Sequence, residues 1–211
     1  MRLSLSGPNL LKRLKPLDSA HFCAALVALV YAAFILVRLN VLGGPTAFIV
    51  AGDRFVNAAE AQPGLIIHPH GAGYDGQFYY RLALNPFDHH LTAYGVTLDK
   101  PAYRQQRILY PLLAWLLAFG QPPLVPITLI LVNYAALIAL AFIAGRYAQA
   151  LGRSALWGLA APLYPGFVLS LANDLAEPLA GLLLVTALLF AHRKRFGVAT
   201  VALSLAILTR E

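Results

Sequence analysis

One short segment of this sequence places a carboxylate among aromatic and amide side chains. Residues 73–85 read GYDGQFYYRLALN, in which Gly73 and Gly76 lie close to Asp75 on either side and aromatics follow. A carboxylate near apolar surface can take a proton from a hydroxyl group, which is the work of a general base. The same spacing also suits a helix N-cap, in which Asp75 would accept hydrogen bonds from the amides of a helix over residues 76–84. The residues leave both interpretations open.

A second group of side chains suits the recognition of phosphate. Tyr103, Arg104 and Arg107 lie in the sequence YRQQR, just before a short apolar stretch. Guanidinium groups pair bidentately with phosphate oxygens, so these arginines could hold a phosphorylated ligand. Arginines also lie at membrane interfaces simply because their long stems reach toward water. Both explanations stay open at this point.

Three more charged residues lie at the ends of apolar stretches. Asp174 and Glu177 occur in NDLAEP, where acidic side chains would also stabilise the start of a helix through its dipole. Arg210 follows the apolar run 196–208, and an ionisable residue at membrane depth indicates function by default. The neighbouring Glu211 could pair with Arg210, which weakens this indication.

The composition excludes an ordinary soluble domain. Of the 211 residues, 59% are hydrophobic and only 12% are charged. The net charge of +7 does not indicate nucleic acid, because the basic residues cluster beside apolar stretches. No nucleotide fingerprint occurs, and the histidines of HPH and HH lack a recognisable ligand spacing, so we expect no cofactor and no metal. Cys23, the single cysteine, is expected to be an inert packing residue.

The elements that must position these residues are membrane helices. The apolar runs predict an all-α, polytopic transmembrane protein with about five membrane segments. These segments are residues 21–42, 124–145, 155–172, 175–191 and 196–208. Residues 43–123 form a long loop, in which we expect short amphipathic helices on the membrane surface over 76–84 and 107–119. The run 108–119 is short for a span, since about 20 residues are needed to cross.

The distribution of basic residues decides the orientation. If 108–119 does not cross, the basic residues near the N-terminus, after residue 145 and after residue 191 all face the cytoplasm, where Asp18 is the single acid. The loop 43–123 and the turn with Asp174 and Glu177 then share the outer side. The sequence therefore predicts a basic cytoplasmic segment 1–20, a first span 21–42 that remains as an anchor, an outer loop 43–123 and a transmembrane region 124–211.

The end of the chain is unusual for a membrane protein. The run 196–208 is short for a span, and Thr209, Arg210 and Glu211 follow it directly. Charged residues at that depth need partners. We therefore expect this chain to be the N-terminal part of a longer protein, or a truncated product.

Several motifs occur in an order that resembles a known family. YDGQFY follows the first span, RILYPLL precedes the short apolar run, LYPGF and NDLAEP come before and at an outer turn, and LTRE ends the chain. Over nearly the whole chain this order resembles the GT-C superfamily of polytopic glycosyltransferases. Among these it is most similar to bacterial membrane proteins assigned to cell-surface glycopolymer formation. Each motif is short, so their order carries the resemblance.

The resemblance implies transfer of a sugar from a polyprenyl-phosphate donor to a glycan or lipid acceptor. The reaction would take place at the outer face of the bacterial inner membrane. Asp75 best matches the acidic catalytic position of the first outer loop, and Asp53 is the second choice. Arginines would hold the lipid phosphate, and the acidic turn would lie near the site. The candidates for substrate binding are Tyr79, Arg104, Arg107, Asp174, Glu177 and Arg210.

The alternative is a non-catalytic membrane protein. It would be a scaffold or a carrier of lipid-linked glycans that uses the same arginines for binding only, or an inactive truncated product. Asp75 discriminates between these classes, because an enzyme needs a base and a carrier does not.

Overall fold

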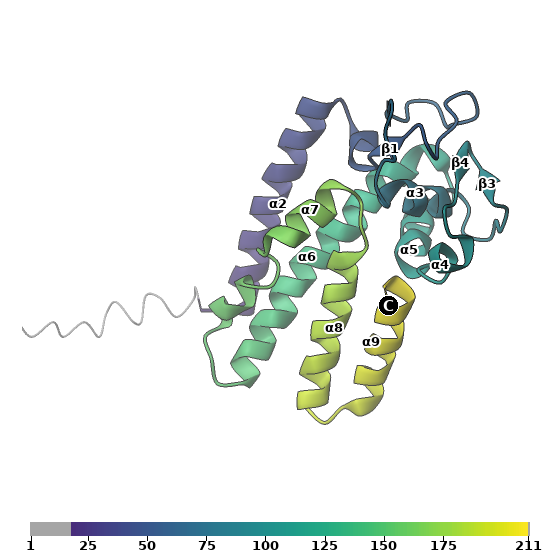
Figure 1. Ribbon diagram of the computed structural model, residues 1–211. Helices are drawn as coiled ribbons and strands as arrows, with labels where there is room; N and C mark the ends of the chain where they lie inside the picture. Colours follow the sequence, from purple (N-terminus) through teal and green to yellow (C-terminus); the bar gives the residue numbers. More distant parts are fainter. Residues whose placement is uncertain (1–17, 211) are drawn as a thin grey trace, which may run out of the picture.

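The computed structural model describes residues 18–210 and is mostly helical (Figure 1). Its longest helices form a bundle, and the segment between the first two of them folds into a separate unit at one end of it. The bundle helices are α2 (Ala20–Leu42), α6 (Val125–Ala150), α8 (Glu177–His192) and α9 (Phe196–Thr209). The predicted cytoplasmic segment 1–20 lies almost wholly outside the described residues, as does Glu211.

α2 begins and ends where its sequence provides caps. The Ser19 hydroxyl accepts a hydrogen bond from the Phe22 amide at 3.1 Å, and Gly43 ends the helix in the left-handed conformation with φ 83°. Much of its surface is both apolar and exposed, with Leu29 at 71% and Val41 at 73%. Such a surface suits a helix that is surrounded by lipid.

Within the described residues, two helical stretches are long and apolar enough to cross a membrane. One is α2, with 23 residues, and the other is the 29-residue stretch Pro122–Ala150, which joins η2 (Pro122–Leu124) to α6. α8 and α9 are shorter, with 16 and 14 residues. The predicted helical class is confirmed, whereas the number of about five spans remains a prediction.

Residues 155–172, which we expected to form one span, are not a continuous helix. They form η3 (Ala155–Leu159), a turn, and α7 (Pro165–Ala172). Pro162 and Pro165 explain the break, because proline lacks an amide donor and its ring clashes with the preceding helical turn. A single helix over this segment is therefore wrong, and α7 packs as a short helix against α6 and α8.

The unit between α2 and α6 mixes short helices with short strands. Its strands pair as two ladders, β1 (Ala51–Gly52) parallel to β2 (Ile67–His68), and β3 (Thr92–Ala93) antiparallel to β4 (Val96–Thr97). Its helices are η1 (Pro45–Phe48), α3 (Gly76–Leu84), α4 (Pro101–Gln105) and α5 (Leu109–Leu117).

Both helices predicted in this unit form, but their surroundings differ from our expectation. α3 has the predicted bounds, yet all 9 of its residues are buried, so the expected amphipathic surface helix is wrong. The reason is that α3 is enclosed by α4, α5, α6 and neighbouring strands. α5 is shorter than the predicted 107–119. Its 9 residues rise about 14 Å, less than half of a hydrocarbon core of about 30 Å, so α5 does not cross by itself.

Two apolar cores meet on α6. The first core joins the unit to the bundle and includes Tyr79, Tyr110 and Leu129. The second packs α2 against α6 and includes Cys23, which is fully buried, as expected of a packing residue. The unit that carries Asp75 is thereby fixed on the same helix that anchors the bundle.

Candidate functional site

The beginning of α3 lies directly against the turn between α7 and α8. A Cβ atom on Gly76 would lie 2.3 Å from the Asn173 carbonyl oxygen and 2.7 Å from that of Ile49. Only glycine fits here without moving the backbone on either side. This contact places Asp75 and the acidic turn at the same end of the molecule, as the charge pattern predicted.

The loop before α3 is held in place by a side chain of the helix itself. The Gln77 carboxamide donates to the Ala72 carbonyl at 2.8 Å and accepts from the Gly52 amide at 3.1 Å. Gly73, in the left-handed conformation with φ 66°, allows the loop to pass close to Gly52. Gln77 is 1% exposed, so these hydrogen bonds fix the approach of the chain to Asp75.

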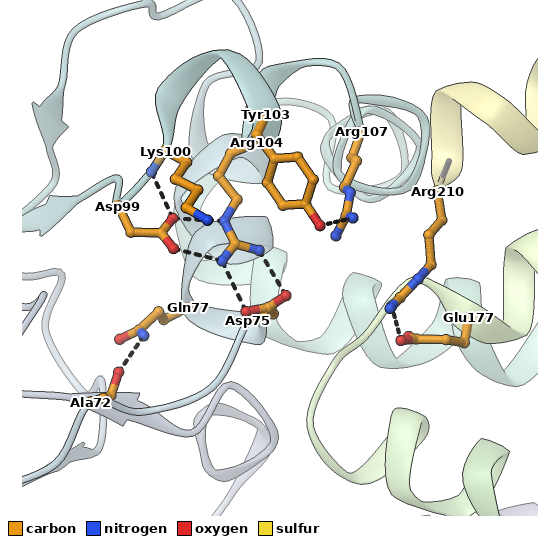
Figure 2. A network of polar contacts seen from close by, with 10 residues as sticks. All are labelled: Ala72, Asp75, Gln77, Asp99, Lys100, Tyr103, Arg104, Arg107, Glu177 and Arg210. Carbon is orange, nitrogen blue, oxygen red and sulfur yellow. Dashed lines mark hydrogen bonds and ion pairs between the residues drawn. The ribbon is translucent and has the colours of Figure 1, made fainter.

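Asp75 forms a bidentate ion pair with Arg104 (Figure 2). Asp75 Oδ2 lies 2.7 Å from Arg104 Nη1, and Asp75 Oδ1 accepts from Nη2 at 3.0 Å. The Arg104 side chain is 6% exposed, whereas that of Asp75 is 38% exposed. Asp75 occupies the N-cap position of α3 without any side-chain hydrogen bond to the helix amides, so the N-cap interpretation is wrong.

A second carboxylate, Asp99, completes the coordination of Arg104. Asp99 Oδ1 accepts from Nε at 2.8 Å and Oδ2 from Nη2 at 2.9 Å, while the Phe78 ring lies 4.3 Å from the guanidinium carbon. Burial by itself would lower the pKa of Arg104, but the hydrogen bonds to Asp99 and Asp75 raise it above its ordinary value. The hydrogen bond from Arg104 likewise lowers the pKa of Asp99. Arg104 therefore joins the two acids and has little capacity left for a ligand phosphate.

Arg107 and Arg104 lie on opposite sides of Tyr103 (Figure 2). Its guanidinium carbon is 3.9 Å from the centre of the Tyr103 ring, and it donates a hydrogen bond to the hydroxyl of the same tyrosine. Burial raises the pKa of Tyr79 to about 12, and the nearby charge of Arg107 partly opposes this rise. Glu177 and Asp75 act on Tyr79 as well, so Tyr79 lies among all three charged groups.

Arg210 and Glu177 form a separate ion pair between the end of α9 and the start of α8 (Figure 2). Their side chains are 40% and 28% exposed, so the pair is open to solvent. The predicted alternative partner, Glu211, lies outside the described residues. Glu177 thus supplies the opposite charge that Arg210 requires.

Asp174 is the opposite case, a carboxylate without a partner. It is 0% exposed, neither oxygen has a hydrogen bond, and its φ of 48° is one that aspartate tolerates. Burial raises the pKa of Asp174 well above its usual range, and the charge of Arg38 only partly opposes the rise. Complete burial therefore favours the neutral form of this carboxyl group.

Asp53, the second candidate for the base, holds a loop together. Its two oxygens accept from the amides of His70 at 2.8 Å and Gly71 at 3.1 Å. The hydrogen bond from His70, followed by that from Gly71, lowers the pKa of Asp53. The structure does not bring Asp53 to Arg104, whose carboxylate partners are Asp75 and Asp99.

A hollow of about 430 Å³ lies beside the acidic turn. Glu177, Tyr74 and Ser170 are on its wall, and the remainder is mostly apolar, contributed by α7 and α8. The hollow therefore joins one charged group, Glu177, and hydroxyl groups to an apolar surface, which suits a ligand with one polar and one apolar end.

The sequence interpretation missed two polar residues that connect the cluster. Asp99 precedes Arg104 by five positions across the start of α4, and this spacing was the available signal. Asn133 lies inside the predicted span 124–145, where a lone amide in an apolar run signals a buried contact. Its Nδ2 donates to the Tyr110 hydroxyl and to the Leu175 carbonyl, both at 2.9 Å.

The histidines of the sequence do not assemble with acids into a larger cluster. Within residues 18–210, no group of three or more His, Cys, Asp or Glu side chains is placed to hold a metal ion. The His90 ring contacts Asp88 at 2.7 Å, and Asp88 also pairs with Arg81.

No protein-family model, curated protein or solved structure matches the chain.

Proposed function

We propose that the chain is a membrane glycosyltransferase of the GT-C type, which transfers a sugar from a polyprenyl-phosphate donor during assembly of cell-surface polysaccharide or glycolipid. One observation carries the proposal. Asp75 and the acidic turn, about 100 residues apart in the chain, touch at Gly76 and Asn173 at one end of an apolar bundle. Arginines from α4, the α4–α5 connection and the end of α9 lie at the same end.

In this proposal Asp75 is the general base. Its carboxylate takes the proton of the acceptor hydroxyl, whose oxygen then forms the new bond to the anomeric carbon of the sugar. The bond between that carbon and the donor phosphate breaks, and its electron pair leaves with the phosphate. Arg104 keeps the carboxylate oriented, while 38% of the Asp75 side chain stays exposed for the acceptor.

The donor would occupy the hollow beside Glu177. Its apolar chain would lie along α7 and α8, and its phosphate would reach Arg210, whose side chain is 40% exposed. A phosphate there takes the place of Glu177 as the partner of Arg210 and meets a positive charge as negative charge develops on the leaving group. Arg107, stacked on Tyr103, adds positive charge nearby.

The test compares two variants that each remove one carboxylate from Arg104. Asp75→Asn should lower sugar transfer by about 10²–10⁴ and leave donor affinity within about tenfold, because an amide cannot accept the proton. Asp99→Asn removes an equivalent ion pair without removing the base, so it should cost at most about tenfold in rate. Transfer from polyprenyl-phosphate sugars is measured after both variants are shown to insert and fold. Equal losses in the two variants would mean that Asp75 only holds Arg104.

The non-catalytic alternative is favoured by one observation, the complete pairing of Arg104 by two carboxylates. A carrier or scaffold would use this network only to stabilise the unit. In that case Asp75→Asn lowers stability and the binding of the donor together, and no transfer is measured with the unchanged chain.

We further propose that the chain lies in the bacterial inner membrane with its N-terminus in the cytoplasm and residues 43–123 outside. The single cysteine is buried, so introduced thiols are labelled against a low background. An impermeant thiol reagent on intact cells should label His89→Cys and spare Arg193→Cys. Both positions are exposed, but position 89 lies between α3 and β3 in the unit at one end of the bundle, and position 193 lies in the turn between α8 and α9 at the other end. Labelling of position 193 from outside would reverse the orientation.

A further inference from the structure

A second hollow lies where α2 meets the unit of residues 43–123, and Asn173 of the turn after α7 forms part of its wall. It has a volume of about 280 Å³. Arg38, His68 and Asn173 supply its polar wall, and Leu42, Val50 and Ile66 are among its apolar residues. Arg38 is one turn from the end of α2, at the level where a spanning helix meets the lipid headgroups.

Arg38 is held in place but is not neutralised. Nη2 donates to the Ala172 carbonyl at 2.8 Å, and the guanidinium carbon lies 5.0 Å from the centre of the Phe48 ring. Arg81, Arg104 and Arg210 each pair with a carboxylate, whereas the described residues give Arg38 no such partner within ion-pair distance. Asp174 acts on Arg38 electrostatically without forming an ion pair, and burial raises the pKa of that carboxyl group well above its usual range. Within the described residues, Arg38 therefore carries its positive charge without an ion pair to balance it.

We propose that this hollow binds the phosphodiester headgroup of an anionic phospholipid from the outer leaflet. The inference rests on α2 crossing the membrane and is independent of the proposed sugar transfer. A guanidinium pairs well with phosphate oxygens, and His68 and Asn173 offer further polar contacts.

A phospholipid fits this hollow better than a free phosphate does. Leu42 lines the hollow and is 42% exposed, so the hollow opens toward the apolar surface of α2. That surface continues along the helix through Val41 and Val37, which are 73% and 63% exposed. Acyl chains of a lipid bound at Arg38 would lie along it and add hydrophobic binding that an inorganic anion lacks.

Bound phosphatidylglycerol is counted on the detergent-purified chain by native mass spectrometry, over a range of lipid concentrations. Arg38→Gln should weaken its binding about tenfold or more, because a charge-assisted hydrogen bond is lost while a side-chain donor to Ala172 is kept. Arg54→Gln is the matched control, since Arg54 is exposed in the same unit and stacks only on Phe55. The affinity of Arg54→Gln for phosphatidylglycerol should stay within about twofold of that of the unchanged chain. Equal affinities of the Arg38 and Arg54 variants would overturn the proposal.

Two further variants keep the test decisive if Arg38→Gln does not fold. Ile66→Glu puts a negative charge on the wall of the hollow without removing any contact of Arg38, and it should also weaken binding about tenfold. An unchanged affinity in Ile66→Glu would contradict the site. Asp174→Asn should leave binding within about twofold, and a large gain in affinity would mean that Asp174 is ionised and already compensates Arg38, against the proposal.

The source of the phosphate is tested with two partial ligands. Diacylglycerol has the acyl chains without the phosphate, and inorganic phosphate has the charge without the chains. Phosphatidylglycerol should raise the melting temperature of the chain more than either one at the same concentration. If inorganic phosphate raised the melting temperature as much as phosphatidylglycerol, the ligand would be a free anion, and the assignment of a phospholipid would be overturned. These measurements do not use sugar transfer, so their outcome is independent of the proposed enzyme activity.

Discussion

Asp75 and Asp174 lie on two segments that touch, but their surroundings are opposite. Asp75 is bound by both terminal nitrogens of Arg104 and keeps 38% of its side chain exposed. Asp174 is 0% exposed and neither of its oxygens has a partner. An acid next to the start of a helix was predicted at both places, so local sequence did not distinguish them.

The difference shows which of the two can exchange a proton with a substrate. A base must be reachable and correctly oriented, and Asp75 meets both conditions. Asp174 is enclosed, burial raises its pKa, and its turn instead packs against Gly76. Within the proposed sugar transfer, Asp75 is therefore the candidate for the base, and the turn of Asp174 is a candidate for positioning it. The predicted role of Asp174 in substrate binding is not supported by its complete burial.

The largest expected effect comes from removing the partner of Asp75. Arg104→Met keeps much of the side-chain volume but leaves Asp75 and Asp99 unpaired around a buried site. It should lower the free energy of unfolding by about 3 kcal/mol. Arg54→Met, at an exposed arginine, should change it by less than about 1 kcal/mol. Unfolding in mixed micelles measures both, and similar values would mean that the ion pairs of Arg104 contribute nothing.

The contact between the two segments is tested by adding one methyl group. Gly76→Ala forces a Cβ to within 2.3 Å of the Asn173 oxygen, so it should destabilise the chain by about 2 kcal/mol and separate Asp75 from the acidic turn. Gly197→Ala is the control, because nothing lies within 4 Å of a Cβ there. It should be neutral or stabilise the helix by about 0.5–1 kcal/mol. Equal melting temperatures of the two variants would contradict the close contact.

The neutral state of Asp174 predicts a dependence of stability on pH. Its pKa in the folded state is raised above the unfolded value of about 4, so its stabilising contribution is full below pH 4 and falls as the pH rises toward the folded pKa. The Asp174→Asn variant has no carboxyl group at this position and therefore does not lose this contribution. Between pH 5 and pH 6, the free energy of unfolding of the variant should rise relative to that of the unchanged chain by roughly 1.4 kcal/mol. A constant difference across this range would show that Asp174 is ionised and paired.

Elements with strong local signals can be predicted from the sequence. Ser19 and Gly43 fix the ends of α2, and the bounds of α3 follow from the pattern of residues 76–84. The long apolar runs determined the helical class, because only a helix or a closed barrel satisfies backbone groups in lipid. Charge asymmetry was enough to put Asp75 and the acidic turn at the same end. The two prolines in 155–172 carried the signal of a broken helix, which the apolar composition outweighed in our prediction.

Only the tertiary structure decided what each charged side chain does. Arg104 pairs with Asp75 across 29 residues and Arg210 with Glu177 across 33, and contacts over such separations leave no local pattern. The burial of Asp174 depends on the packing of distant segments, among them the contact of the turn after α7 with the start of α3, which no propensity of NDLAEP encodes. An ion pair or an orphaned carboxylate is set by distance and by exclusion of water, and both arise only once distant segments pack together.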